Sequence, residues 1–191
     1  MKIKIGFFTV LLALSLLLDH SPLSLATLAA ALTHELGHVA AASLCGIRLR
    51  ECRIGLYGAG LVPDGRLYSY GQEILLCAAG PSVNLLLGLL GARLLSHTLA
   101  PWLAAFVFAS FALGLLNLLP IKDFDGGRIL NALLCRRFSP TLAHRVLALL
   151  SFAFIFALWS LSVYLLLRAA ASLSLFVFSL SLFFRIFLSE N

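Results

Sequence analysis

Charged side chains are scarce in this sequence, and their scarcity narrows its class. Asp, Glu, Lys and Arg make up 12% of the 191 residues, whereas 61% are hydrophobic, and the mean hydropathy is +1.03. A soluble globular chain has about 25% charged and about 45–50% apolar residues. The composition therefore predicts an all-α polytopic membrane protein. With so few charges, the net charge of +6 does not indicate nucleic-acid binding and is instead a signal of topology.

Paired cysteines and hydrophilic segments are also missing. The four cysteines form no C-x-x-C pair, so neither a zinc knuckle nor a disulfide framework is expected. We expect them to be small, reduced packing residues. No repeat, low-complexity linker or hydrophilic terminal domain is visible, so residues 1–191 are expected to form a single membrane domain.

Six apolar stretches are predicted to be transmembrane helices. They are residues 5–18, 23–45, 73–96, 99–119, 145–167 and 171–188. The first could instead belong to a signal peptide, but cleavage after the small residues 29–31 would remove half of the next helix. Between the second and third helices, the Arg- and Gly-rich residues 46–70 carry the turn signal Pro63-Asp64-Gly65. A small membrane-associated β-hairpin is predicted there.

The positive charges predict an orientation. With six spans, one side of the membrane holds both termini, residues 46–70 and residues 121–140. Of the 14 basic residues, only Arg93 and Arg168 fall toward the other side. The positive-inside rule then places both termini in the cytoplasm. We expect a multi-pass protein of a bacterial cell membrane, and an odd number of spans would remove this charge asymmetry.

An H-E-x-x-H pattern, formed by His34, Glu35 and His38, lies inside the second apolar run. An ionisable group near the bilayer centre costs about 2.5–3.5 kcal/mol on insertion scales, so three within five residues need a reason. Residues i and i+4 of a helix share a face, and both imidazoles could therefore bind one zinc ion. Glu35 is then a candidate base beside a metal-bound water. The alternative is two histidines packed with satisfied hydrogen bonds.

A catalytic zinc site also needs a third protein ligand. Counted from Cys45, at the predicted cytoplasmic end, His38 lies about 10 Å deep and His34 about 16 Å deep. The entrance to the site is therefore expected on the cytoplasmic side. Two acids follow the fourth helix on that side, Asp123 and Asp125, and the spacing leaves both open as the ligand.

The local context favours Asp125, because Gly126-Gly127 allows tight turning and close approach of the backbone. A short helix is expected over residues 127–137. The alternative role for Asp123 or Asp125 is therefore an N-cap at the start of that helix.

Three motifs follow one another along the chain. They are His34-Glu35-Leu36-Gly37-His38, then Ala79-Gly80-Pro81-Ser82-Val83-Asn84, then Asn117-Leu118-Leu119-Pro120 leading to Asp125-Gly126-Gly127-Arg128. In order and separation they resemble the site-2 protease family of intramembrane zinc metalloproteases, over nearly the whole chain. The compact layout is similar to the branch that contains the stage IV sporulation protein FB. This sequence departs from the family in having Asp123 where a proline is common, and from that branch in having no CBS domain.

The resemblance implies that His34, His38 and Asp125 bind one Zn²⁺ ion and that Glu35 is the catalytic base. It also implies that Asn84 lies near the site and that Asn117 and Pro120 shape the segment that delivers Asp125. Either asparagine amide could hold a substrate backbone or stabilise an oxyanion. Hydrogen bonding between helices is the alternative role for both asparagines.

The function implied is hydrolysis of a peptide bond in or near a transmembrane segment of a membrane-bound protein substrate. This is regulated intramembrane proteolysis, with a transcription-factor precursor as one substrate type and a membrane regulator as one kind of partner. Two alternatives stay open. One is a non-catalytic metal-binding scaffold or regulator of the same fold, and the other is a small metal transporter.

Overall fold

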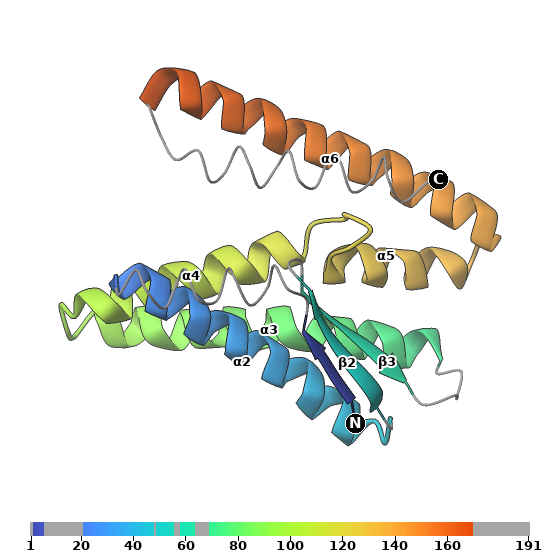
Figure 1. Ribbon diagram of the computed structural model, residues 1–191, viewed down its shortest axis with the longest axis horizontal. Helices are drawn as coiled ribbons and strands as arrows, with labels where there is room; N and C mark the ends of the chain where they lie inside the picture. Colours follow the sequence, from blue (N-terminus) through green and yellow to red (C-terminus); the bar gives the residue numbers. More distant parts are fainter. Residues whose placement is uncertain (1, 6–20, 48, 56–57, 64–68, 170–191) are drawn as a thin grey trace.

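The computed structural model describes residues 2–5, 21–47, 49–55, 58–63 and 69–169. Three strands and five helices occupy this part of the chain (Figure 1). They are β1 (Lys2–Ile5), α2 (Pro22–Leu44), β2 (Leu49–Gly55), β3 (Gly58–Pro63), α3 (Tyr70–Leu95), α4 (Pro101–Asn117), α5 (Asp125–Cys135) and α6 (Pro140–Ala169). The predicted spans 5–18 and 171–188 lie outside the described residues, apart from Ile5, which belongs to β1.

Local sequence signals explain where the helices begin. Ser21 caps α2 by accepting a hydrogen bond from the Ser24 amide at 3.1 Å, and Pro22 follows at a position where no N–H is needed. Ser69 and Gln72 form a capping box at the start of α3. These signals place α2 and α3 within one to three residues of the stretches predicted from hydropathy.

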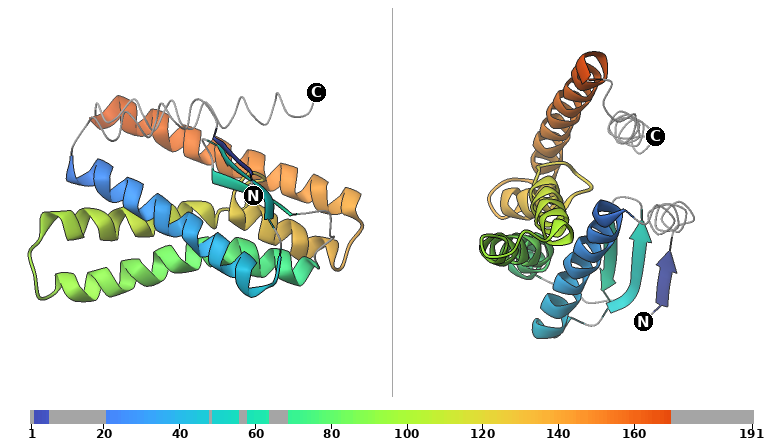
Figure 2. Two further views of the ribbon diagram at one scale, coloured as in Figure 1. Left: turned by 60° about the horizontal axis from the view of Figure 1, so that its bottom comes forward. Right: turned by 90° about the vertical axis from the view of Figure 1, so that its left-hand side faces the viewer.

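Helices α2, α3 and α4 pack together, with α2 between the other two helices and the strands in the right-hand view of Figure 2. Small side chains at Ala26 and Ala30 of α2 meet Ala109 of α4 in one buried cluster. At the α2–α3 crossing, a Cβ on Gly37 would lie 3.0 Å from the Ala79 carbonyl oxygen. The absence of a side chain at this glycine therefore lets α2 and α3 approach closely.

The loop between α4 and α5 is held between α5 and α6. A Cβ on Gly126 would run into the Leu118 carbonyl, and one on Gly127 into the Ile121 carbonyl. Only glycine at these two positions allows the first turn of α5 to pack directly on the loop backbone. On the other side, Ile121 is buried in a cluster with Ile155 of α6.

The three strands form one sheet in the order β1-β2-β3. Strand β1 runs parallel to β2, whereas β2 and β3 are antiparallel, with Gly55 paired to Gly58. The connection between β2 and β3 thus falls between Gly55 and Gly58, whereas of the predicted turn Pro63-Asp64-Gly65 only Pro63 lies within the described residues. Pro63 ends β3, opposite Leu49. The membrane association of this segment stays a prediction.

Among the described residues, two helices are long and apolar enough to cross a membrane, over Tyr70–Leu95 and Pro140–Tyr164, by length and composition alone. The outer surface of α3 is also apolar, since Leu86, Leu89 and Leu90 are each more than half exposed. Large exposed apolar areas are rare on soluble monomers. These observations agree with a membrane location, while the count of six spans stays a prediction.

Candidate metal centre

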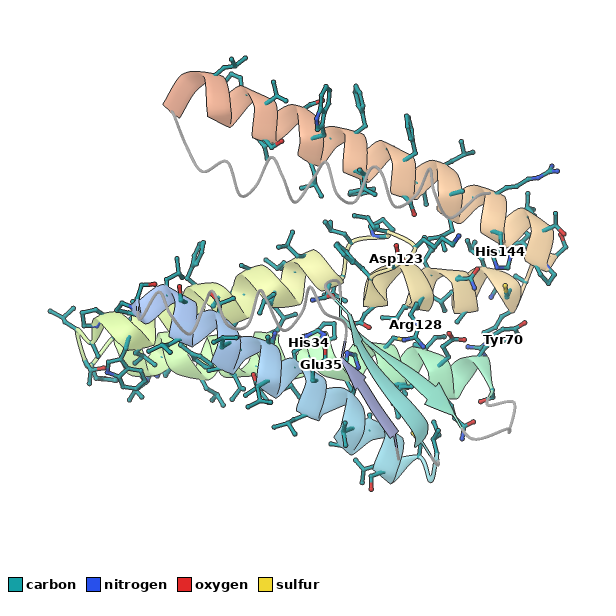
Figure 3. The ribbon with its side chains drawn as sticks, viewed as in Figure 1. His34, Glu35, Tyr70, Asp123, Arg128 and His144 are labelled. Carbon is teal, nitrogen blue, oxygen red and sulfur yellow. The ribbon has the colours of Figure 1, made fainter. Side chains whose placement is uncertain are left out.

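Two imidazoles lie one helical turn apart on the buried face of α2. His34 and His38 are 6% and 5% exposed, whereas Leu32 and Leu36 on the opposite face are 62% and 56% exposed. This is the face sharing that the i, i+4 spacing predicts. Glu35 follows His34 directly and is half-buried (Figure 3).

Asp125 completes a triangle of ligand atoms with the two histidines. Its Oδ2 atom lies 3.0 Å from His34 Nε2 and 3.2 Å from His38 Nε2, and the two Nε2 atoms are 3.1 Å apart. Among the described residues, these three form the one group of His, Cys, Asp and Glu side chains that could hold a metal ion. The fold therefore brings together residues that are 91 positions apart in the sequence.

The donor set and its spacing suit zinc. Imidazole nitrogen and carboxylate oxygen bind Zn²⁺ at about 2.0–2.2 Å, so that neighbouring ligands of a tetrahedron lie about 3.3–3.5 Å apart. The three atoms here are separated by 3.0–3.2 Å, slightly closer than that. Catalytic zinc sites use three protein ligands and leave the fourth position to water or substrate. The residues present fit such a site.

Gly80 of α3 makes room for the imidazoles. A Cβ on Gly80 would lie 2.8 Å from His34 Nε2 and nearer still to His38 Nε2. Pro81 stands inside α3, where its missing N–H interrupts the helical hydrogen-bond ladder. One turn before Gly80, the Leu76 carbonyl accepts a hydrogen bond from His38 Nδ1–H at 2.8 Å. His38 Nε2 therefore presents its lone pair to the site.

Asn84 lies one turn beyond Gly80 and is fully buried. Its Nδ2 atom is 3.4 Å from His34 Nδ1, and its Oδ1 atom is 3.3 Å from Thr33 Oγ1. Asn84 thus contacts the edge of the His34 ring that faces away from Asp125. The role predicted for it at the substrate stays a prediction, and its observed polar contacts are to Thr33 and His34.

Asn117 is the last residue of α4 and is half-buried. Its Nδ2 atom donates to the Leu113 carbonyl at 3.0 Å, within the same helix. It therefore lies at the beginning of the loop that leads to Asp125. Its role near an oxyanion, like the role of Glu35 as a base, stays a prediction.

Asp125 is the first residue of α5 and is not its N-cap, which is Phe124. The N-cap role considered for Asp123 and Asp125 is therefore wrong. A carboxylate in the first turn is stabilised by the helix dipole. Burial disfavours the charged form of Asp125, but His34 and His38, when protonated, donate hydrogen bonds and bring positive charge that outweigh burial and lower the pKa of this carboxyl.

Asp123 is half-buried in the loop before α5 and is not part of the metal-binding group. Figure 3 shows it on the side of the loop next to α6, whereas His34 lies on the other side of α5's first turn. The acid that replaces a common proline of the family thus points away from the candidate ligands. The spacing in the sequence left both Asp123 and Asp125 open as the third ligand. In the structure it is Asp125 that lies beside the two histidines.

Ser151 of α6 is a residue that the motifs did not single out. It is fully buried, its hydroxyl oxygen accepts a hydrogen bond from the Lys122 amide at 2.9 Å, and it reaches the Pro120 carbonyl at 3.5 Å. Ser151 thereby fastens the loop that carries Asp125. The available signal was a hydroxyl within a predicted apolar span, which needs a hydrogen-bond partner in the same way as the asparagines do.

Comparisons with known proteins agree with this site. The model of Peptidase family M50 matches residues 91–158, which include the loop and Asp125. "Putative zinc metalloprotease Rip3" of Mycobacterium tuberculosis, found in two strains, is 32% identical over 121 residues, or 58% of this chain. The matched part covers 30% of that protein's length.

A solved structure has the same fold. "Site-2 Protease from Methanocaldococcus jannaschii" superposes with a TM-score of 0.67, covering 99% of this chain and 90% of the other, at 21% sequence identity. Together with the sequence matches, this confirms the resemblance to the site-2 proteases of peptidase family M50. The sporulation branch is not singled out by any of them.

Proposed function

We propose that this chain is an intramembrane zinc metalloprotease, in which His34, His38 and Asp125 hold the metal ion. The observation that carries the proposal is the buried triangle of their ligand atoms, 3.0–3.2 Å apart. When bound at such a site, zinc polarises a carbonyl and lowers the pKa of water to about 7. Residues 1–191 would form one catalytic domain.

Glu35 supplies the proton transfers of the proposed reaction. Its carboxylate takes a proton from the water that attacks the scissile carbonyl, so that a C–O bond forms. It then passes this proton to the amine as the C–N bond breaks. Its half-buried position, adjacent to His34 on α2, supports this role. Asn117, at the start of the loop to Asp125, is the candidate for hydrogen bonding to the substrate.

The proposed substrate is a transmembrane or membrane-associated protein. A helical substrate must unwind before its peptide bonds can be cleaved, and its exposed amides could then add to the edge of the sheet at β3. We further propose six spans with both termini and the entrance of the site in the cytoplasm of a bacterial cell, as the basic residues indicate. A transcription-factor precursor, in sporulation or another pathway, is one such substrate.

The test is co-expression of the chain with candidate single-span membrane regulators. Glu35→Gln is expected to retain one zinc ion per chain and to lose the cleaved product, because the metal ligands remain while the base is removed. Asp123→Asn is the matched control, since it also converts a half-buried acid to its amide, and it should still cleave. Full cleavage by Glu35→Gln would refute the mechanism.

The two alternative functions give different outcomes in this system. A scaffold or regulator would contain zinc in the wild type, yet cleave none of the co-expressed proteins. A transporter would carry metal across liposomes, and Glu35→Gln would change that flux. The ionisable residues of α2 are confined to positions 34–38 of a 23-residue helix, which favours a local site over a pathway through the membrane.

A further inference from the structure

The two imidazoles of the candidate metal centre are both held from α3 through their Nδ1 atoms. A neutral imidazole binds a metal through one nitrogen only when the other nitrogen carries the proton. For His38 this condition is met by the Leu76 carbonyl, which can only accept a hydrogen bond. For His34 the neighbour of Nδ1 is the side-chain amide of Asn84, which can donate or accept.

The hydroxyl of Thr33 decides between these two orientations. Thr33 Oγ1 lies 3.0 Å from the Ala30 carbonyl and 3.3 Å from the Asn84 amide. A hydroxyl has one proton to donate, and the Ala30 carbonyl, at the shorter distance, can only accept it. Once that proton goes to Ala30, the hydroxyl is an acceptor toward Asn84, and the NH₂ group of Asn84 must face Thr33; this is a half-turn of the amide from the placement given above, which has Oδ1 at Thr33 and Nδ2 at His34.

The consequence for His34 follows from the shape of an amide. The oxygen and nitrogen of a carboxamide exchange places on a half-turn with almost no change in volume, so the hydrogen-bond partners determine the orientation. With its NH₂ group toward Thr33, Asn84 presents Oδ1 to His34 Nδ1. The Nδ1 atom must then carry the proton, and Nε2 keeps its lone pair toward Asp125 and His38.

We propose that Asn84 is a positioning residue: oriented by Thr33, it accepts the Nδ1–H of His34 and holds that imidazole in the form that binds metal. The inference rests on the proposed metal site but not on proteolysis. Asn84 is 0% exposed, so water does not reach its amide. The hydrogen-bond chain from the Ala30 carbonyl through Thr33 and Asn84 to His34 is therefore completed by protein groups alone. Every donor in that chain then has an acceptor.

The test measures Co²⁺ and Zn²⁺ binding by the purified full chain in detergent, with cobalt absorption and competing chelators as the readout. Asn84→Leu keeps a similar volume but removes the acceptor, and should lower the affinity about 10- to 100-fold, as loss of such outer-sphere partners does. Asn84→Asp keeps an acceptor oxygen and should bind within a few-fold of the wild type. A residue that merely packs would give the opposite order, because a buried carboxylate packs worse than leucine.

Thr33 gives a second, milder test if Asn84→Leu fails to fold. Thr33→Val removes the hydroxyl at constant shape and should weaken metal binding, whereas Thr33→Ser keeps the hydroxyl and should restore it. Ser110→Ala is the control, because Ser110 is a fully buried serine of α4 whose hydroxyl has no partner among the described residues. Its loss should leave metal affinity unchanged.

Nitrogen-15 and proton chemical shifts of the histidines in the zinc-loaded protein report whether the Nδ1–H of His34 is hydrogen-bonded. This Nδ1–H should show a hydrogen-bonded shift in the wild type and in Asn84→Asp, and lose it in Asn84→Leu. If the wild type binds no metal, the proposed function fails. If the wild type binds and both Asn84→Leu and Thr33→Val bind equally well, only the role of Asn84 is overturned.

Discussion

Gly80 of α3 lies directly against both histidines, and its replacement by alanine separates metal binding from folding. In a helix interior, alanine is more favourable than glycine by about 0.5–1 kcal/mol. On helix stability alone, Gly80→Ala should therefore be neutral or stabilising. The new methyl group, however, would occupy space that the two Nε2 atoms now use.

The displacement can be estimated from the contact distances. The added Cβ would lie 2.8 Å from His34 Nε2, whereas ordinary Cβ contacts begin at 3.4 Å, so this ligand atom must move by about 0.6 Å and His38 Nε2 by more. Metal–ligand distances tolerate a deviation of about 0.2 Å. We therefore expect Gly80→Ala to lower zinc affinity by at least about tenfold, equivalent to about 1.4 kcal/mol.

The assay is zinc content per chain after chelator competition, together with thermal unfolding of the metal-free protein. Gly71→Ala in the same helix is the matched control, because its Cβ would meet only Ser69 Oγ at 3.7 Å. Gly71→Ala should leave the zinc affinity and the unfolding temperature close to those of the wild type. Wild-type zinc affinity in Gly80→Ala would refute the packing that places His34 and His38 against α3.

Two further predictions concern the loop that delivers Asp125. Asp125→Asn should abolish stoichiometric zinc binding, because an amide is a poor ligand beside two imidazoles, whereas Asp123→Asn should retain it. The zinc content of both purified proteins tests this, and an equal loss of zinc would mean that both acids bind the metal. Ser151→Ala should reduce the free energy of unfolding by about 1–3 kcal/mol, since it leaves the Lys122 amide without its acceptor. Denaturant titration measures this loss, and an unchanged midpoint would show that the hydrogen bond does not hold the loop.

The positions of the helices, and the residues that share a helical face, could be predicted from the sequence. The i, i+4 spacing of His34 and His38 places them on one face of any helix, and α2 has them there. The four helices α2, α3, α4 and α6 coincide with four of the predicted spans, and α5 with the predicted short helix, within a few residues at each end. These features depend on neighbours in sequence, so periodicity and hydropathy are enough to predict them.

The β-strands were harder to place for a physical reason. The turn signal Pro63-Asp64-Gly65 is strong by composition, but a strand's partner is chosen by pairing over the whole ladder. The pairing of Gly55 with Gly58 puts the β2–β3 connection between those two residues, and β1, from Lys2–Ile5, pairs with the other edge of β2. Turn propensity is a weak term beside a ladder of backbone hydrogen bonds.

The composition of the metal centre was already present in the sequence, as two histidines on one helical face and an acid after the fourth helix. Which acid it is, and what holds the imidazoles, depends on contacts between segments far apart in the chain. Gly126 and Gly127 pack α5 against the loop so that Asp125 faces α2, and Asn84 meets His34 across the α2–α3 contact. Such long-range contacts have no period along the sequence, so tertiary packing alone decides them.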